Sequence, residues 1–177
     1  MKKILSTIAA TAILATSSFA IDTEKVYMSA SLGLEQTSGY DSGIAMILTS
    51  GLPVMEKGEA GPGELAVEAE LTFDLSSPSV GGLDVSFFTF GGYAVWKYDI
   101  TEQFFVKPRA GLVYQSVSVN TSYLGTTYNT SNSEISLSMG LQGGYAINDN
   151  LDVIFGYNFA VSGYSLSQLS AGVQYSF

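Results

Sequence analysis

Apolar and polar residues alternate along several stretches of the chain. The clearest stretch is 64–75, where every odd-numbered position is apolar and every even-numbered position except Ala66 is polar or acidic. The same period of two recurs at 25–35, 134–146 and 151–162. Successive side chains of a β-strand point to opposite faces, so each stretch predicts a strand with one apolar and one polar face.

Taken over the whole chain, this pattern and the turn signals between the stretches predict eight strands. The second and fourth are the least regular, because residues 44–48 and 87–90 are largely apolar without strict alternation. An even number of antiparallel strands brings both chain ends to one side of a closed barrel. The predicted strands are 25–35, 43–52, 64–75, 84–98, 104–117, 134–146, 151–162 and 166–177.

The connections between the predicted strands differ in length. Residues 99–103 and 148–150 form short polar turns, whereas 36–42, 76–83 and 118–133 are longer and rich in Ser, Thr, Gly and Asn. Short turns at one end and longer loops at the other are typical of transmembrane barrels. Two connections depart from this rule, because 53–63 is long for the short-turn end and 162–165 is short for the loop end.

The first 20 residues predict a removable export signal. Lys2 and Lys3 precede an apolar run over 4–14, and small residues at Ser18 and Ala20 fit a cleavage site after Ala20. The apolar run is too short, and too often interrupted by Ser and Thr, to favour a membrane anchor. We therefore expect a signal peptide over 1–20 and one β-barrel domain over 21–177, with no transmembrane helix.

Composition excludes several functions. The chain has no Cys and no His, so disulfide frameworks, imidazole catalysis and zinc sites with Cys or His ligands are ruled out. It carries 7 basic and 16 acidic residues, a net charge of −9, which argues against binding to nucleic acid. We accordingly assign no catalytic residue, metal ligand or cofactor.

Periodicity alone leaves open whether the apolar faces point inward, as in a soluble barrel, or outward to lipid. Gly and Ser recur on the polar faces, which suits a crowded interior. Aromatic residues near strand ends are typical of the girdles at the two membrane interfaces. These aromatic residues are Tyr27, Tyr93, Trp96, Tyr98, Phe104, Phe105, Tyr114, Tyr145, Tyr157, Tyr175 and Phe177.

The last strand carries the most specific motif. Its polar residue Ser170 is followed at fixed spacings by Gly172, Tyr175 and a final Phe177. This arrangement resembles the carboxyl-terminal insertion signal of bacterial outer-membrane barrels. The resemblance implies that the barrel assembly machinery of the outer membrane reads this strand. An ordinary edge strand that happens to end in Phe is the alternative.

The stretch 21–177 as a whole resembles the small eight-stranded outer-membrane barrels of the OmpA-like transmembrane domain, OmpX and opacity-protein types. Residues 105–114 are similar to the fifth strand of that family, and 143–153 are similar to its junction between strands six and seven. The resemblance implies an all-β, eight-stranded, antiparallel up-and-down transmembrane β-barrel. It also implies a bacterial outer-membrane location and contact with lipid and lipopolysaccharide.

An eight-stranded barrel is just wide enough for its own side chains to fill. The polar face of 64–75 places acidic residues in this interior, and few cations are available to pair with them. The favoured interpretation is a charge-paired plug, and the alternative is a gated path for small ions. The expected lumen charge network comprises Glu64, Glu68, Glu70, Lys107 and Arg109.

These observations favour a non-catalytic protein with an envelope structural or surface-interaction role. The enzymes that resemble this architecture use His, which this chain lacks. A narrow, porin-like pore for small solutes or ions is one alternative. The other is an adhesin that binds a host or cell-surface ligand through its loops, because 118–133 combines Tyr123 and Tyr128 with Ser, Thr and Asn.

Overall fold

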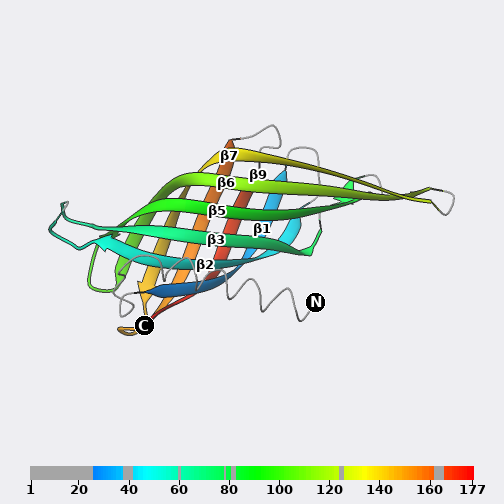
Figure 1. Ribbon diagram of the computed structural model, residues 1–177. Helices are drawn as coiled ribbons and strands as arrows, with labels where there is room; N and C mark the ends of the chain where they lie inside the picture. Colours follow the sequence, from blue (N-terminus) through cyan, green and yellow to red (C-terminus); the bar gives the residue numbers. More distant parts are fainter. Residues whose placement is uncertain are drawn as a thin grey trace.

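The computed structural model describes residues 26–37, 42–59, 61–77, 79–80, 83–123, 126–161 and 166–177 (Figure 1). The predicted export signal and its cleavage site at Ala20 lie outside the described residues. Within the described ranges, no helix has the length and hydropathy needed to cross a membrane. The strands are β1 (Tyr27–Thr37), β2 (Gly43–Met55), β3 (Glu64–Ser76), β4 (Ser79–Val80), β5 (Leu83–Asp99), β6 (Phe104–Tyr123), β7 (Thr126–Ala146), β8 (Leu151–Val161) and β9 (Leu166–Ser176).

Eight long strands form a closed antiparallel barrel (Figure 1). The hydrogen-bonded order is β3-β2-β1-β9-β8-β7-β6-β5, and pairing of β3 with β5 closes the ring. The two-residue strand β4 pairs with the start of β5 and is not one of the eight strands that form the barrel wall. The predicted eight-stranded, up-and-down barrel is therefore confirmed.

The burial pattern shows that the barrel carries its apolar face on the outside. Along β3, Glu68 and Glu70 are buried. The apolar side chains at the alternate positions point outward, and Val67 is 47% exposed. Leu112 and Phe155 are each 60% exposed on the outer surface. An exterior of this kind is stable in hydrocarbon, because polar groups of the barrel are satisfied internally.

Three aromatic residues that we expected in the membrane girdles lie in the lumen instead. Tyr27, Tyr93 and Phe105 are only 4–7% exposed. Glycines make room for all three rings, because a Cβ at Gly51 would collide with Tyr27, one at Gly91 with Tyr93 and one at Gly144 with Phe105. The outer face keeps the remaining girdle aromatics that are clearly exposed, namely Tyr98, Phe104, Tyr114, Tyr145, Tyr157, Tyr175 and Phe177.

The largest departure from the predicted strands is the β6–β7 hairpin. Residues 118–133, which we expected to form a loop, continue the antiparallel ladder as far as Tyr123 opposite Thr126. The segment is rich in Ser and Thr but contains no Pro and a single Gly, so little in it interrupts a ladder. The hairpin consequently extends past the other strands of the barrel (Figure 1).

Candidate functional site

Four charged side chains form a buried network across the lumen, which we call the ion-pair belt (Glu68, Glu70, Lys107 and Arg109). The guanidinium of Arg109 lies 2.8 Å from Glu70 Oε2 and 3.5 Å from Glu68 Oε2. Lys107 Nζ lies 3.0 Å from the other oxygen of Glu68. All four side chains are at most 6% exposed. Because the acids come from β3 and the bases from β6, the belt connects strands that are separated by β5.

Two aromatic side chains pack against the two bases of the belt. Lys107 Nζ lies 4.7 Å from the ring centroid of Tyr27, and the Arg109 guanidinium lies 3.7 Å from that of Tyr93. The Tyr27 hydroxyl also donates a 2.7 Å hydrogen bond to Glu68 Oε1. Aromatic faces attract desolvated cations, so each ring lowers the cost of burying the base beneath it.

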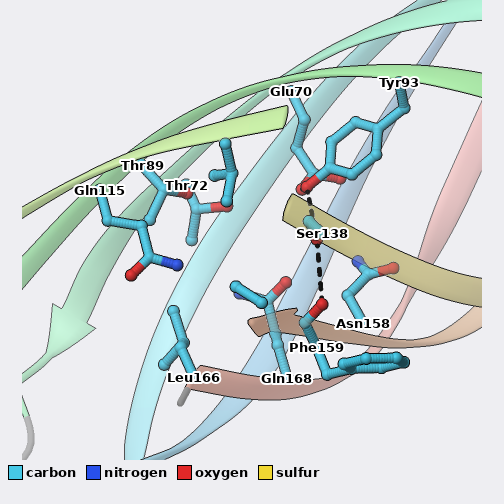
Figure 2. Close-up of a pocket in the computed structure, with 12 residues that line it drawn as sticks. Glu70, Thr72, Thr89, Tyr93, Gln115, Ser138, Asn158, Phe159, Leu166 and Gln168 are labelled. Atoms are coloured by element: carbon cyan, nitrogen blue, oxygen red, sulfur yellow. Dashed lines mark hydrogen bonds between the residues drawn. The ribbon is translucent and has the colours of Figure 1, made fainter. Parts of the chain in front are cut away.

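Further polar side chains extend the network to other strands. Lys107 donates to Gln174 Oε1 at 2.8 Å, and Gln174 donates in turn to Asp152 Oδ2 at 2.9 Å. On the opposite side, Ser138 Oγ lies 3.3 Å from the Tyr93 hydroxyl and donates to the Phe159 carbonyl (Figure 2). Side chains from β1, β3, β5, β6, β7, β8 and β9 thus meet in one connected network.

The belt separates two cavities. The first has a volume of about 30 Å³ and is bounded by Glu70 of the belt and by Tyr93, with Gln115 and Gln168 beyond them (Figure 2). A cavity of this size holds about two water molecules. Both amide atoms of the buried Gln115 lack a protein hydrogen-bond partner in the described structure, so water is their natural partner.

The second cavity has a volume of about 190 Å³ and lies at the end of the barrel that carries Phe177. Lys107 forms its boundary with the belt, and Glu64 and Lys97 line it. Glu64 lies opposite Lys97 in the β3–β5 ladder, whereas the carboxylates that contact the belt cations are Glu68 and Glu70. Glu64 thus lines this second cavity and is not part of the ion-pair belt.

Several residues that contact or extend the ion-pair belt are not predicted by the sequence analysis. Tyr27 and Tyr93 were assigned to the girdles, and Gln174 and Asp152 were given no role. The alternation of polar and apolar residues does indicate an inward position for Tyr27, because this residue shares its face of β1 with Ser31 and Glu35, both of which are buried. The same parity argument places Gln174 on the inner face of β9.

The three residues of the predicted insertion signal lie on β9 or directly after it. The rings of Tyr175 and Phe177 contact each other on the outer surface, with centroids 5.0 Å apart. Gly172 lies opposite Ser31 in the β1–β9 ladder, and a Cβ there would collide with Ser31 and the Ala30 carbonyl. Among the described residues, no group of three or more Asp and Glu side chains is arranged to hold a metal ion.

A closed antiparallel barrel with an apolar exterior and a polar, ion-paired interior is a transmembrane β-barrel. Residues 6–177 match the family model of the outer membrane protein beta-barrel domain. The chain belongs to this family, which places it in the bacterial outer membrane.

Solved structures support the same fold. Neisserial surface protein A is 20% identical, with a TM-score of 0.66, over 86% of this chain and 96% of that protein. The attachment invasion locus protein Ail of Yersinia pestis is 14% identical, with a TM-score of 0.61, over 86% of this chain and 97% of Ail. The outer membrane enzyme PagL is 12% identical, with a TM-score of 0.52, over 84% of this chain and 99% of PagL. No curated protein matches the chain.

Proposed function

We propose that the protein is a non-catalytic outer-membrane barrel in which a closed anchor presents the β6–β7 hairpin at the cell surface. The observation that carries this proposal is the contrast between a lumen crossed by the ion-pair belt and a hairpin whose strands have 20 and 21 residues. About 9–11 residues suffice for a strand to span a bilayer. Roughly half of each hairpin strand is therefore available outside the membrane.

The direction of the hairpin follows from the positions of the turns. The start of β1 at Tyr27 and the end of β9 before Phe177 lie at the same end of the barrel as the connections 100–103 and 147–150. In outer-membrane barrels, short turns face the periplasm and longer elements face outward. The tip of the β6–β7 hairpin lies at the opposite end and so faces the cell exterior.

Cysteine labelling on intact cells tests this arrangement. The chain contains no Cys, so Ser131→Cys on the hairpin and Asp149→Cys on a turn each introduce a single reactive thiol. A membrane-impermeant maleimide should label the hairpin variant on intact cells. It should label the turn variant only after the outer membrane has been permeabilised. The reverse pattern would overturn the proposal.

A narrow pore for small solutes or ions is the second candidate function. It is supported by the two cavities, because both touch the belt and would form a path if the belt opened. Opening requires three buried ion-pair contacts to separate together. Since unpaired charges in a low-dielectric interior are costly, the closed form is favoured. Single-channel recordings distinguish an anchor from a pore.

Binding of a host or cell-surface ligand is the form of surface interaction that the hairpin supports. Ail has been solved in complex with the heparin analogue sucrose octasulfate, which shows a glycan analogue bound to a neighbour of the same fold. In this chain, residues 126–136 contain Glu134 as their one charged residue, which suits polar contacts rather than attraction of a sulfated anion. Cell binding by hairpin-shortened variants tests this role.

The proposed absence of catalysis rests on the side chains. PagL is described as an enzyme, so the fold alone permits catalysis. This chain has no His to act as a base near neutral pH, and its buried acids Glu68 and Glu70 already contact Lys107 and Arg109. We assign the protein no cofactor.

We further propose that export and insertion use the two ends of the chain. Removal of residues 1–20 after Ala20 would leave Ile21 as the first residue, and the barrel assembly machinery would read Gly172, Tyr175 and Phe177. Lipid and lipopolysaccharide then contact the apolar exterior. Intact-mass measurement of the purified protein tests the cleavage, because a mass that includes residues 1–20 would contradict it.

A further inference from the structure

Two carboxyl groups that the ion-pair belt does not use meet at the hairpin end of the lumen. Glu35 is 1% exposed near the end of β1, and the half-buried Asp74 lies near the end of β3. The two side chains hydrogen-bond to each other, and we call them the carboxyl pair. Strand β2 separates β1 from β3, but its inward residues Gly43 and Ala45 are small, so the two carboxyls can meet across them.

One oxygen of each carboxyl has a neutral hydrogen-bond donor. Gln168 Nε2 donates to Glu35 Oε1 at 3.1 Å, and the Phe87 amide donates to Asp74 Oδ2 at 2.7 Å. The second oxygens, Glu35 Oε2 and Asp74 Oδ1, are buried and receive no hydrogen bond from any other group that the structure describes. Ionised carboxylates only accept hydrogen bonds, so these two oxygens can satisfy each other only when one of them carries a proton.

The basic side chains of the barrel lie elsewhere. Those after position 25 are Lys57, Lys97, Lys107 and Arg109. The last two form the belt. Lys57 pairs with Asp99 at 3.0 Å, and Lys97 Nζ lies 4.8 Å from the ring centroid of Phe105, both at the opposite end of the barrel. Two carboxylates in contact in a low-dielectric interior repel strongly, so a proton is the counter-charge that remains for the carboxyl pair.

The other titratable groups that the structure describes in the lumen have different partners. Glu134 lies on the inner face of β7 near the same end, but its carboxylate accepts a hydrogen bond from a serine of its own strand. On β3, Glu70 contacts Arg109. The contacts from β5 and β9 are the neutral ones of Phe87 and Gln168. The remaining groups belong to the network of the belt or to the second cavity, namely Tyr27, Glu64, Glu68, Tyr93, Lys107 and Asp152.

The carboxyl pair lies on the far side of the first cavity from the belt. Along the inner face of β3, Glu70 belongs to the belt, Thr72 lines the cavity and Asp74 belongs to the carboxyl pair. Gln168 lines the same cavity and holds Glu35 (Figure 2). The lumen is therefore crossed twice, once by ion pairs and once by two carboxyls, with the cavity between the two crossings.

We propose that Glu35 and Asp74 share one proton and that this proton bridge is a second, pH-sensitive closure of the lumen. The bridge joins β1 to β3 across β2. When alkaline pH removes the proton, the two carboxylates repel each other, the hairpin ends of β1 and β3 separate, and the first cavity opens to solvent. This closure does not depend on which end of the barrel faces the cell exterior.

The sign of the pH dependence follows from proton linkage. Carboxyls of the unfolded chain are ionised above about pH 5, whereas the folded carboxyl pair keeps one proton, so unfolding releases that proton. The stabilisation is complete at acidic pH and is lost as the pH rises. The equilibrium constant for unfolding should therefore increase by up to about tenfold per pH unit until the folded pair also loses its proton.

Infrared spectroscopy detects the shared proton directly. A protonated carboxyl has a C=O stretching band that an ionised carboxylate lacks. The folded wild type in detergent micelles, with a chelator to exclude divalent cations, should show this band at about pH 7, where exposed carboxyls are ionised. Glu35→Gln and Asp74→Asn should each remove the same component of the band, because the carboxyl pair holds a single proton.

The same variants change the pH dependence of stability. Glu35→Gln places an amide where the protonated carboxyl stands, so it keeps a hydrogen-bond donor and cannot lose a proton. Urea unfolding over a pH series, followed by Trp96 fluorescence, should show one proton fewer released than in the wild type. Glu134→Gln is the matched control, since Glu134 is a lumen carboxylate outside the carboxyl pair. It should keep both the infrared band and the wild-type pH dependence.

Three results would overturn the proposal. The first is the absence of the band from the wild type at neutral pH, a measurement that requires no variant to fold. The second is a band or a pH dependence of unfolding that Glu35→Gln and Asp74→Asn leave unchanged. The third is loss of the same band component in Glu134→Gln, which would assign the proton to another carboxyl.

Discussion

The strands β6 and β7 pass through two contrasting environments. Inside the barrel they are paired on both sides, and their inward side chains, such as Lys107 and Arg109, are buried in ion pairs. Beyond the rim, the ladder with β6 is the one strand pairing that the described residues show for β7, and Ile135 is 73% exposed. The contrast teaches that one length of these strands is held by buried ion pairs, while the other projects from the barrel and is the part to which we assign surface interaction.

Loss of the shared acid of the belt should have the largest effect. Glu68→Ala leaves Lys107 and Arg109 buried with fewer partners, so we expect the free energy of unfolding to fall by about 3–5 kcal/mol. Urea unfolding in detergent micelles, followed by fluorescence of the single Trp96, measures this change. A loss below about 1 kcal/mol would place the belt among the weak surface ion pairs and contradict its structural role.

Removal of the central base should have a similar but smaller effect. Arg109→Leu leaves Glu70 without its close cation but keeps the Lys107–Glu68 pair, and an apolar side chain fills part of the space. We expect a lower unfolding temperature and a loss of about 2–4 kcal/mol. Thermal unfolding monitored by circular dichroism checks this, and an unchanged midpoint would show that Arg109 does not stabilise the barrel.

Overpacking of the lumen should have an intermediate effect. A Cβ at Gly144 would collide with the Phe105 ring, whereas the nearest atom to a Cβ at Gly143 would be 3.9 Å away. We therefore expect Gly144→Ala to cost about 1–3 kcal/mol of unfolding free energy and Gly143→Ala to cost little. Equal losses for the two neighbours would show that the inward ring does not require the glycine.

Shortening the hairpin should have the smallest effect on stability. A variant that lacks residues 119–130 and joins Ser118 to Ser131 through a short turn keeps the whole belt and the β7–β8 ladder. We expect its free energy of unfolding to stay within about 0.5 kcal/mol of the wild type, as for surface changes away from buried contacts. A larger loss would erase the contrast between the two regions.

The sequence predicted the barrel well because period-two alternation follows directly from strand geometry. Leu65, Val67 and Leu71 could be assigned to one face and Glu68 and Glu70 to the other without any knowledge of neighbouring strands. Which acid meets which base depends on register and strand tilt, so the separation of Glu64 from the belt was not predictable.

Two further differences have physical causes. Tyr27 and Phe105 lie near strand ends, where an aromatic ring suits both a membrane girdle and a lumen, and the glycine beside each ring leaves room for it inside. The segment 118–133 has the composition of a loop. Its first half nevertheless pairs with its second half in an antiparallel ladder, which gives the backbone groups local hydrogen-bond partners. Composition therefore distinguished this segment from the barrel strands but did not predict that it stays paired.

Single-channel recording in planar bilayers tests the central claim most directly, because the account holds that the ion-pair belt closes the lumen. The wild-type protein, incorporated under conditions in which it migrates as a folded, heat-modifiable barrel on gels, should show no unit conductance steps. Stable, reproducible steps from the wild type, enlarged by Glu68→Ala, would show instead that the belt gates an open path and that the barrel is a pore.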